Sequence, residues 1–301
     1  MKFVSFRNPA GEVRAGWLQE DGVVDMALAS RGKLPSSMME FLQDSERNLE
    51  AARELENRVP ATHALEDVRL TCPLPRPNTF RDFVGFETHF TNAKRKFNEP
   101  IPPEWYQIAA FYFSNPNTFV GPDEPVKRPQ GCERMDYELE LACIIGKQGG
   151  DIRAEEADDY MFGFAILNDW TARDLQLPEI RIGLGMAKGK DFATSMGPYI
   201  VTKDELKPYR VGDRYDLEMR AYRNGVLMCS GNYKDVYYSF GQMIERASAN
   251  VQLYPGDVIA SGTVGYGTIL EIGAEEHGWL QPGDVIEFTI TGLGTLRNTV
   301  V

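Results

Sequence analysis

Acidic residues occupy every second position of one short stretch, Met135 to Gly146, whose other residues are mostly apolar. Successive side chains of a strand point to opposite faces, so Asp136, Glu138 and Glu140 would share one face of a strand. The apolar residues around and after Glu140 predict that this strand is buried, and buried carboxylates need a counter-charge or a metal ion. A half-exposed strand with an acidic wet face is the alternative that the pattern leaves open.

A further acid ends the apolar run of residues 163–168. Asp169 stands at the end of this predicted strand, and the residues after it have helical character. If Asp169 opens a helix, Arg173 and Gln176 share its face. Carboxylate oxygens of this kind suit Mg²⁺, Ca²⁺ or Mn²⁺ better than Zn²⁺, so these acids predict a divalent-cation site. The alternative is an N-capping aspartate that forms a salt bridge with Arg173.

Composition excludes several other classes of protein. A formal net charge of -12 disfavours nucleic acid and acidic membrane surfaces as partners. The four cysteines lack the spacing of zinc sites and indicate packed thiols in a reducing compartment. No stretch of about 18 apolar residues is present to cross a bilayer, and the first residues do not form a signal-peptide pattern. We therefore expect a cytoplasmic protein.

The first part of the chain predicts a small α/β unit. Residues 2–18 form two alternating runs around a turn at residues 8–11, and residues 22–29 offer a third strand. Residues 36–57 have a helical pattern, with Ser36 and Ser45 as N-caps. Pro73, Pro75 and Pro77 then interrupt regular structure, so we expect a small N-terminal domain at 1–69 and the main domain at 70–301.

The main domain is expected to be mostly strands, with one clear helix at residues 239–250 and a tight hairpin turn at Asn224–Gly225. The roster lacks the strand–helix alternation of a doubly wound fold. The pattern therefore indicates an α+β protein, mainly β, built around a mixed and curled sheet or β-roll.

From about Leu70 to Val301 the chain resembles the fumarylacetoacetate hydrolase superfamily, in particular its fumarylacetoacetase branch. The matching stretches, in chain order, are YELELACIIGK, NDWTARDLQ, KDFATSMGPYIVT, ASGT and PGDVIEFTITGLGTLRNTV. The resemblance implies a mixed β-roll/sandwich catalytic domain in a homodimer. It further implies one Mg²⁺ or Ca²⁺ ion, with Mn²⁺ as a substitute, and cleavage of a carbon–carbon bond in a small 2,4-diketo acid.

The resemblance also implies roles for individual residues. The implied metal ligands are Asp82, Glu138, Glu140 and Asp169, with Lys190 and Thr194 lining the same site and Asp136 behind it. The implied catalytic residues are His89, its partner Glu271, Lys190, Arg173 and Gln176. The implied substrate contacts are Tyr112, Thr263, Arg173 and Gln176. His89, held by Glu271, would take a proton from the attacking water.

Three positions depart from the fumarylacetoacetase pattern. Val84 and Ile180 stand where that branch has tyrosines. Asn98 stands where it has an arginine that binds substrate, although Arg95 and Lys96 are close. The catalytic set is therefore matched more fully than the set that holds the substrate. The same metal site would also serve decarboxylation of a 2-oxo diacid such as oxaloacetate, or isomerisation of a hydroxymuconate. A non-catalytic module with a structural cation is the alternative of another class.

Overall fold

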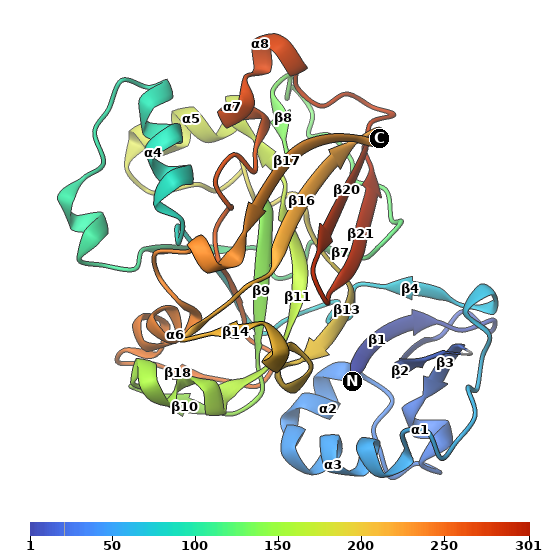
Figure 1. The fold of residues 1–301 in the computed structure, drawn as a ribbon. Helices are drawn as coiled ribbons and strands as arrows, with labels where there is room; N and C mark the ends of the chain where they lie inside the picture. The colour runs from blue at the N-terminus through green and yellow to red at the C-terminus, as the bar shows by residue number, and fades with distance from the viewer. Residues whose placement is uncertain (21) are drawn as a thin grey trace.

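One mixed sheet of eleven strands runs through the computed structural model, which describes residues 1–20 and 22–301. Its strand order is β3-β2-β1-β13-β11-β9-β19-β5-β6, with β4 paired to β1 and β7 to β13. Figure 1 labels the part of this sheet from β3 to β9. The strand bounds are β1 Lys2–Arg7, β2 Val13–Gln19, β3 Gly22–Asp25, β4 Arg69–Thr71, β5 Phe80–Phe83, β6 Phe111–Ser114, β7 Phe119–Val120, β9 Leu139–Ile145, β11 Met161–Asp169, β13 Thr194–Thr202 and β19 Val258–Ala260.

A second sheet of four strands, in the order β17-β16-β20-β21, packs against the central sheet. Its strands are β16 Glu218–Arg223, β17 Val226–Asn232, β20 Val285–Ile290 and β21 Gly294–Thr299. Among the residues that the structure describes, three two-stranded pairs complete the strand structure: β8 Met135–Asp136 with β12 Thr171–Ala172, β10 Gly149–Gly150 with β18 Gln252–Leu253, and β14 Arg210–Val211 with β15 Arg214–Tyr215. The chain is thus α+β and mainly strand, as predicted.

Helices lie around these sheets. They are α1 Met26–Ala29, α2 Met38–Gln43, α3 Ser45–Leu55, α4 Glu87–Lys96, α5 Arg173–Ile182, α6 Phe240–Ser248, α7 Ile269–Ile272 and α8 Ala274–His277, with the 3-10 turns η1 Leu65–Asp67, η2 Pro103–Tyr106, η3 Ala154–Tyr160, η4 Lys203–Tyr209 and η5 Tyr233–Asp235. Within residues 1–20 and 22–301, no helix combines the length and apolarity needed to cross a membrane.

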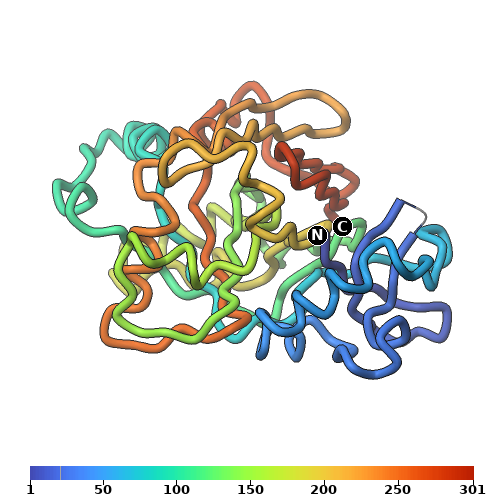
Figure 2. Tube along the Cα trace, turned by 60° about the horizontal axis from the view of Figure 1, so that its bottom comes forward, coloured from blue at the N-terminus to red at the C-terminus, as the bar shows by residue number. Residues whose placement is uncertain are grey.

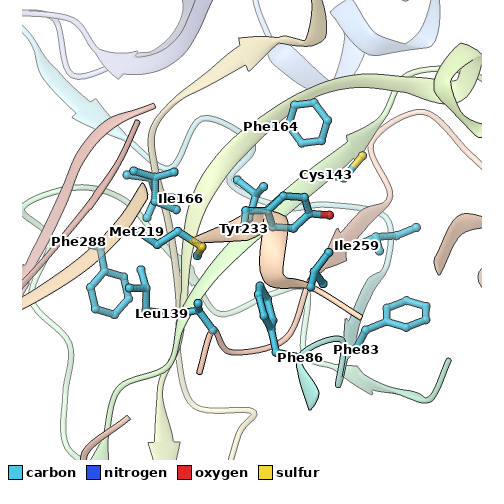
Figure 3. Packing of buried hydrophobic residues seen from close by; sticks show 14 of the residues in the cluster. Phe83, Phe86, Leu139, Cys143, Phe164, Ile166, Met219, Tyr233, Ile259 and Phe288 are labelled. Atoms are coloured by element: carbon cyan, nitrogen blue, oxygen red, sulfur yellow. The ribbon is translucent and has the colours of Figure 1, made fainter. Parts of the chain in front are cut away.

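The main core fills the space between the two sheets. Leu139 and Ile166 of the central sheet lie on the same side as Met219 and Phe288 of the four-stranded sheet, and all four are buried (Figure 3). Helix α6 closes this core with Phe240, which stacks on Tyr233 at 5.3 Å between ring centroids. Leu139, Leu141, Cys143 and Ile145 of β9 face this core, so Glu140 faces the other way, with Ala142 and Ile144.

The N-terminal segment continues the central sheet. Strand β1 pairs with β13 in antiparallel register, with Phe3 opposite Ile200. Figures 1 and 2 show the first part of the chain gathered at one side of the molecule, next to β13. The apolar faces of α2 and α3 pack there with Phe3 and Phe162 in a second core. The boundary at residues 69 and 70 stays a prediction.

Several local predictions are confirmed and others are wrong. The hairpin of β1 and β2, the turn at Asn224–Gly225 and the helix after Ser239 are present. The helix caps differ, because Ser37 caps α2 and Asp44 precedes α3. The Ser45 hydroxyl instead donates to the Gly146 carbonyl at 2.7 Å, which ties α3 to the residue after β9.

Replacement of a core residue on the face away from the acids should cost stability alone. Ile166→Ala is expected to lower the free energy of unfolding by about 2–5 kcal/mol, because the side chain is buried and its loss leaves a cavity. Urea denaturation measures the change. Val226→Ala, at a side chain that is 64% exposed, should stay within about 0.5 kcal/mol and serves as the control. An equal effect of both variants would contradict this packing.

Candidate active site

The register of the central sheet gathers acids from distant parts of the chain on one face. Glu140 of β9 lies opposite Leu167 of β11, so Asp169, two residues further, shares its face. Strand β19 links β9 to β5, with Ala260 opposite both Ala142 and Asp82. Because Ala142 and Glu140 are two residues apart, Asp82 joins the same face. Asp82, Glu138, Glu140 and Asp169 therefore belong to one surface of the sheet.

The same surface extends one strand further on each side. Tyr112 of β6 lies opposite Asp82, and Thr194 of β13 lies opposite Asp169. The Tyr112 hydroxyl contacts the carboxylates of both Asp82 and Asp169. Tyr112 was expected to contact substrate, and here it lies against two predicted metal ligands. Its role in holding substrate stays a prediction.

All four carboxylates are buried, which rules out the acidic wet face. Their residues are 2% (Asp82), 6% (Glu138), 1% (Glu140) and 0% (Asp169) exposed. The ammonium group of Lys190 is buried with them, with its Nζ 2.6 Å from Glu138 Oε2 and 2.5 Å from Asp169 Oδ2. One ammonium among four carboxylates leaves a net negative charge at the sheet surface.

Positive neighbours compensate only part of this cluster. Burial raises the pKa of Glu138, but the charges of Lys190 and Arg173 outweigh it and bring the pKa to about 2. Burial and the neighbouring carboxylates raise the pKa of Asp82 and Glu140 well above the usual range of a carboxyl group. Burial also raises the pKa of Asp169, against the opposing charge of Lys190. Glu138 is therefore the best compensated of the four acids, and the raised pKa of the other three favours their protonated forms unless a cation binds.

The cluster fits a divalent cation by its donor atoms. Asp82 Oδ1 and Asp169 Oδ1 are buried and, among the described residues, have no hydrogen-bond partner. Hard oxygen donors with surplus negative charge are what Mg²⁺, Mn²⁺ and Ca²⁺ bind in proteins. Within the described ranges, no three His, Cys, Asp or Glu side chains already have the spacing of a metal shell. The Lys190 ammonium instead contacts Glu138 and Asp169, so the ligand set stays a prediction.

An imidazole and a carboxylate form a pair beside this cluster. His89 of α4 lies with its Nδ1 2.7 Å from Oε2 of Glu271 on α7. Three further donors hold the Glu271 carboxylate: Asn92 Nδ2 at 3.1 Å, the Tyr266 amide at 2.9 Å and Thr268 Oγ1 at 3.2 Å. This bond makes Nδ1 the protonated nitrogen and leaves Nε2 free to accept a proton. Burial lowers the pKa of His89, but the Glu271 charge raises it more, so the pKa is raised overall.

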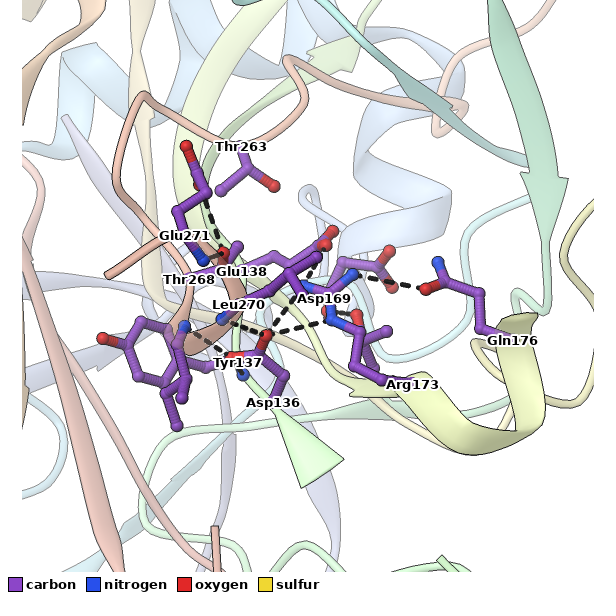
Figure 4. A network of polar contacts seen from close by, with 12 residues as sticks. Asp136, Tyr137, Glu138, Asp169, Arg173, Gln176, Thr263, Thr268, Leu270 and Glu271 are labelled. Atoms are coloured by element: carbon purple, nitrogen blue, oxygen red, sulfur yellow. Dashed lines mark hydrogen bonds and ion pairs between the residues drawn. The ribbon is translucent and has the colours of Figure 1, made fainter. Parts of the chain in front are cut away.

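Arg173 and Gln176 reach the site from α5. One Arg173 guanidinium nitrogen, Nη2, lies 2.8 Å from Glu138 Oε1, and Nη1 donates to Gln176 Oε1 at 3.3 Å (Figure 4). Arg173 and Gln176 therefore lie on the same face of α5, as expected. Asp169 does not open this helix, because it ends β11 and Ala172 occupies the N-cap position. The carboxylate of Asp169 is thereby left for the site.

Thr263 and Thr194 lie at the borders of the cluster. Thr263 Oγ1 donates to Glu140 Oε1 at 3.3 Å, and the Gly262 amide donates to Glu140 Oε2 at 3.1 Å. Gly262 adopts φ +77, and a Cβ there would meet the Phe83 carbonyl at 2.2 Å, so only glycine fits this turn. Thr194 is fully buried. Thr263 thus orients Glu140, and a direct contact with substrate stays a prediction.

Sequence reasoning missed Glu179, which fixes the loop before Lys190. The Glu179 carboxylate accepts the amides of Ala187, Lys188 and Gly189 at 2.9, 2.8 and 3.1 Å. Because one carboxylate binds three consecutive amides, it fixes the backbone conformation at the end of the glycine-rich segment 183–189. The signal available in the sequence was that this segment cannot satisfy its own amides by regular structure. Asn92, one helical turn after His89, was also missed, although the three-residue spacing places it beside the imidazole.

Comparison with known proteins identifies the class. Residues 78–301 match the model of the fumarylacetoacetate (FAA) hydrolase C-terminal domain, so the fold is that of an enzyme family. The chain belongs to the fumarylacetoacetate hydrolase family. This confirms the resemblance found in the sequence. Members of this family are enzymes that use divalent metal ions.

Similar proteins of the family have differing activities. A mitochondrial oxaloacetate tautomerase of Bos taurus is 33% identical over 93% of this chain and 84% of its own length. An oxaloacetate tautomerase of Bacillus subtilis is 32% identical over 89% of this chain and 87% of its own length. The structure of a maleylpyruvate hydrolase from Sphingobium sp. SYK-6, in complex with manganese(II) and pyruvate, has a TM-score of 0.76 and 26% identity. That comparison covers 100% of this chain and 99% of the other.

Removal of the Glu138 carboxylate should weaken metal binding strongly. Glu138→Ala is expected to weaken Mn²⁺ binding more than about 100-fold, since even residues outside the ligand shell commonly cost 10–100-fold. Isothermal titration calorimetry measures the change. Glu54→Ala, at an exposed acid of α3, is the control and should bind Mn²⁺ as the unmodified protein does. Unchanged affinity of the Glu138 variant would remove this residue from the ligand set.

Loss of the Glu179 carboxylate should loosen the loop that presents Lys190. In Glu179→Ala, amide hydrogen exchange at residues 187–189 is expected to accelerate by about tenfold or more, because each amide loses its acceptor. Glu179→Gln, which retains one acceptor oxygen, should lie between this variant and the unmodified protein. Arg181→Ala, at an exposed position of the same helix, is the control. Protection that survives in Glu179→Ala would contradict the clamp.

Proposed function

We propose that this chain is a divalent-metal-dependent hydrolase that cleaves a carbon–carbon bond in a small 2,4-diketo acid of the fumarylacetoacetate or acylpyruvate type. The observation that carries the proposal is the His89–Glu271 pair, with Nδ1 and Oε2 2.7 Å apart, beside a buried cluster of carboxylates. Hydrolysis needs a base for water, and this pair supplies one. A site that only supported the fold would not need a polarised imidazole at its edge.

The residues proposed to hold the metal are Asp82, Glu138, Glu140 and Asp169. A divalent cation bound there would supply a Lewis acid for the adjacent oxygens of a 2-oxo acid. Lys190 and Thr194 border these ligands. We propose Mg²⁺ or Ca²⁺ as the native ion, with Mn²⁺ as a substitute. The manganese(II) in the related maleylpyruvate hydrolase supports a divalent ion of this class.

Proton movements in the proposed reaction begin at His89. Glu271 holds Nδ1–H, so Nε2 takes a proton from water as the water oxygen forms a bond to the substrate carbonyl carbon. Collapse of this adduct breaks the carbon–carbon bond and leaves the electron pair on an enolate. The Lys190 ammonium stabilises the enolate charge, and the proton held by His89 returns to carbon. Arg173 and Gln176 are proposed to orient the substrate, with Tyr112 and Thr263.

Positions around the outer part of the site differ from the fumarylacetoacetase pattern. Asn98 follows the end of α4 with φ 55, a conformation that terminates a helix. Ile180 lies one turn beyond Gln176 on α5 and is 48% exposed. Neither supplies a charge for a distal carboxylate. We therefore place acylpyruvates with a short or apolar acyl group ahead of fumarylacetoacetate as substrates.

A second candidate is the tautomerisation of oxaloacetate. The observation that favours it is the 33% identity, over 93% of this chain, to a bovine oxaloacetate tautomerase. The same pair would then move a proton between carbon and the enol oxygen, with no water attack and no bond cleavage. Decarboxylation of oxaloacetate and isomerisation of a hydroxymuconate use the same elements and complete the alternatives.

A substrate panel separates these reactions. Acylpyruvates, fumarylacetoacetate and oxaloacetate are incubated with the protein and Mg²⁺, Mn²⁺ or Ca²⁺, and products are followed by proton NMR. Hydrolysis yields pyruvate or acetoacetate with a second acid, whereas tautomerisation changes only the ratio of keto and enol forms. Turnover of oxaloacetate enol alone would replace the first candidate by the second.

The partners proposed are small 2-oxo acids and a second copy of the chain in a homodimer, with no nucleic acid or membrane. A cytoplasmic location stays a prediction from composition. Gel filtration with light scattering measures the mass against 33.9 kDa for one chain.

Replacement of His89 should separate chemistry from metal binding. His89→Gln is expected to lower kcat by about 100-fold or more, because positioned acid–base groups contribute 10²–10⁴-fold. The affinity for Mn²⁺ should stay within about threefold, since the imidazole is not among the proposed ligands. His63→Gln, in the N-terminal segment, is the control. Normal hydrolysis by the His89 variant would exclude it as the base.

The pH profile should report the charge on His89. The base must be neutral, so activity is absent well below its pKa and appears as the pH rises through it. Glu271 raises the pKa of His89, so the midpoint for kcat/KM should lie above about 6.5. In Glu271→Gln the raising charge is lost while burial remains, and the midpoint should move to lower pH. Stopped-flow assays across about pH 5–9 measure both profiles. A midpoint that moves to higher pH would contradict the pairing.

A further inference from the structure

We propose that Asp136 is a positioning residue that couples the His89–Glu271 pair to the carboxylate cluster. This inference rests on the proposed function, because it assumes that the pair acts as the base. Asp136 lies outside the proposed metal ligands and substrate contacts. Its side chain nevertheless joins the segment that carries Glu271 to the arginine that contacts Glu138, as Figure 4 shows.

Each carboxylate oxygen of Asp136 accepts two hydrogen bonds. Oδ1 accepts the amides of Ile269 at 2.8 Å and Tyr137 at 2.9 Å. Oδ2 accepts the Leu270 amide at 3.1 Å and Nε of Arg173 at 2.9 Å. The residue is 0% exposed. A carboxylate this buried is tolerated only where donors surround it, and here they come from separate segments.

The first of these connections fixes α7, which carries Glu271. This helix has four residues, Ile269–Ile272, too few to be stable on internal hydrogen bonds. Its first two amides are bound by Asp136, and the third, that of Glu271, donates to Thr268 Oγ1 at 3.1 Å. The backbone immediately before Glu271 is therefore anchored on strand β8. This anchor fixes the backbone from which the Glu271 side chain reaches His89, while donors from Asn92, Tyr266 and Thr268 hold its carboxylate.

The second connection reaches the acid cluster. Arg173 Nη2 lies 2.9 Å from Asp136 Oδ2 and 2.8 Å from Glu138 Oε1. One guanidinium group thus bridges the carboxylate that anchors α7 and a proposed metal ligand. The planar guanidinium permits little change in the distance between these two acids. The base and the acid cluster are positioned against each other through Asp136 and Arg173.

Two other features of the described structure are a cavity and an exposed apolar segment, and neither has contacts that lead to a specific function. A cavity of about 290 Å³ between α3 and η4 is lined by both basic and acidic residues, and several of these already form pairs, such as Arg53 with Asp204 at 2.9 Å. The side chains after α5, including Leu184, are exposed, and no contact in the described structure indicates which partner would cover them. The side chain of Asp136, in contrast, contacts both the helix that carries Glu271 and the arginine that contacts Glu138.

A double-mutant cycle between Asp136 and Glu271 tests the coupling. Asp136→Asn keeps the size of the side chain but removes its charge and presents an amide nitrogen to donors. At saturating Mn²⁺ and with an acylpyruvate that the protein hydrolyses, kcat should fall by about 10–100-fold with KM changed less than about threefold. In the Glu271→Gln background the same change should lower kcat by less than about twofold, because the carboxylate through which Asp136 acts on His89 is already absent. Equal losses in the two backgrounds would overturn the proposal.

Two further variants keep the outcome decisive. Asp257→Asn is the matched control, since Asp257 is also a buried acid that accepts a backbone amide, from Tyr254 at 2.8 Å, and lies 3.9 Å from an arginine. Its thermal stability should fall while kcat stays within about twofold. If Asp136→Asn does not fold, Asp136→Glu keeps the charge and displaces it, and the same non-additivity is expected.

The result also distinguishes this inference from the proposed function. Normal kcat in Glu271→Gln alone would remove the base pair, and the coupling with it. A loss of kcat in Glu271→Gln that multiplies with the loss in Asp136→Asn would preserve the base pair and refute the coupling alone.

Discussion

The burial of four carboxylates on one face of a sheet is the constraint on which the rest of the structure depends. Each buried charge costs several kcal/mol unless it is compensated, and neighbouring acids raise that cost. Lys190 and Arg173 offset part of the charge, mostly at Glu138, whose pKa is about 2. The acids that remain undercompensated define the place where a divalent cation would stabilise the fold and bind a 2-oxo acid. The same carboxylates are therefore expected to lower the stability of the metal-free protein and to support its activity once a metal ion is bound.

The surrounding elements hold these charges in place. The central sheet sets the spacing of the acids, because its strand register is fixed by the packed core on the opposite face. The loop before Lys190 is held by Glu179, and the helix of Glu271 is held by Asp136. Lys190 and Glu271 thus stand on short segments that are each held by a carboxylate, whereas the proposed ligands stand on or beside strands. Both parts of the site are therefore held in place by the structure around them.

Part of this arrangement could be predicted from the sequence, and the reason is local. A period of two places Glu138 and Glu140 on one face, and the position of Asp169 at the end of a strand marks it as a candidate functional acid. No local pattern identifies Asp82 or His89, which were found only through resemblance to a family. The anchoring role of Asp136 depends on amides 133 residues away at Ile269. Register and long-range hydrogen bonds of this kind follow from packing of the whole chain, which a period cannot encode. The helix caps were misplaced by one residue, since several polar residues compete at each boundary.

Anomalous diffraction from a crystal soaked with Mn²⁺ tests the central claim most directly. The account predicts one strong peak on the acid-bearing face of the central sheet, with oxygens of Asp82, Glu138, Glu140 and Asp169 at about 2.0–2.6 Å and the Lys190 ammonium displaced toward the border of the site. A crystal in which these carboxylates stay bound to Lys190 and Tyr112, with no manganese peak between them, would contradict the account.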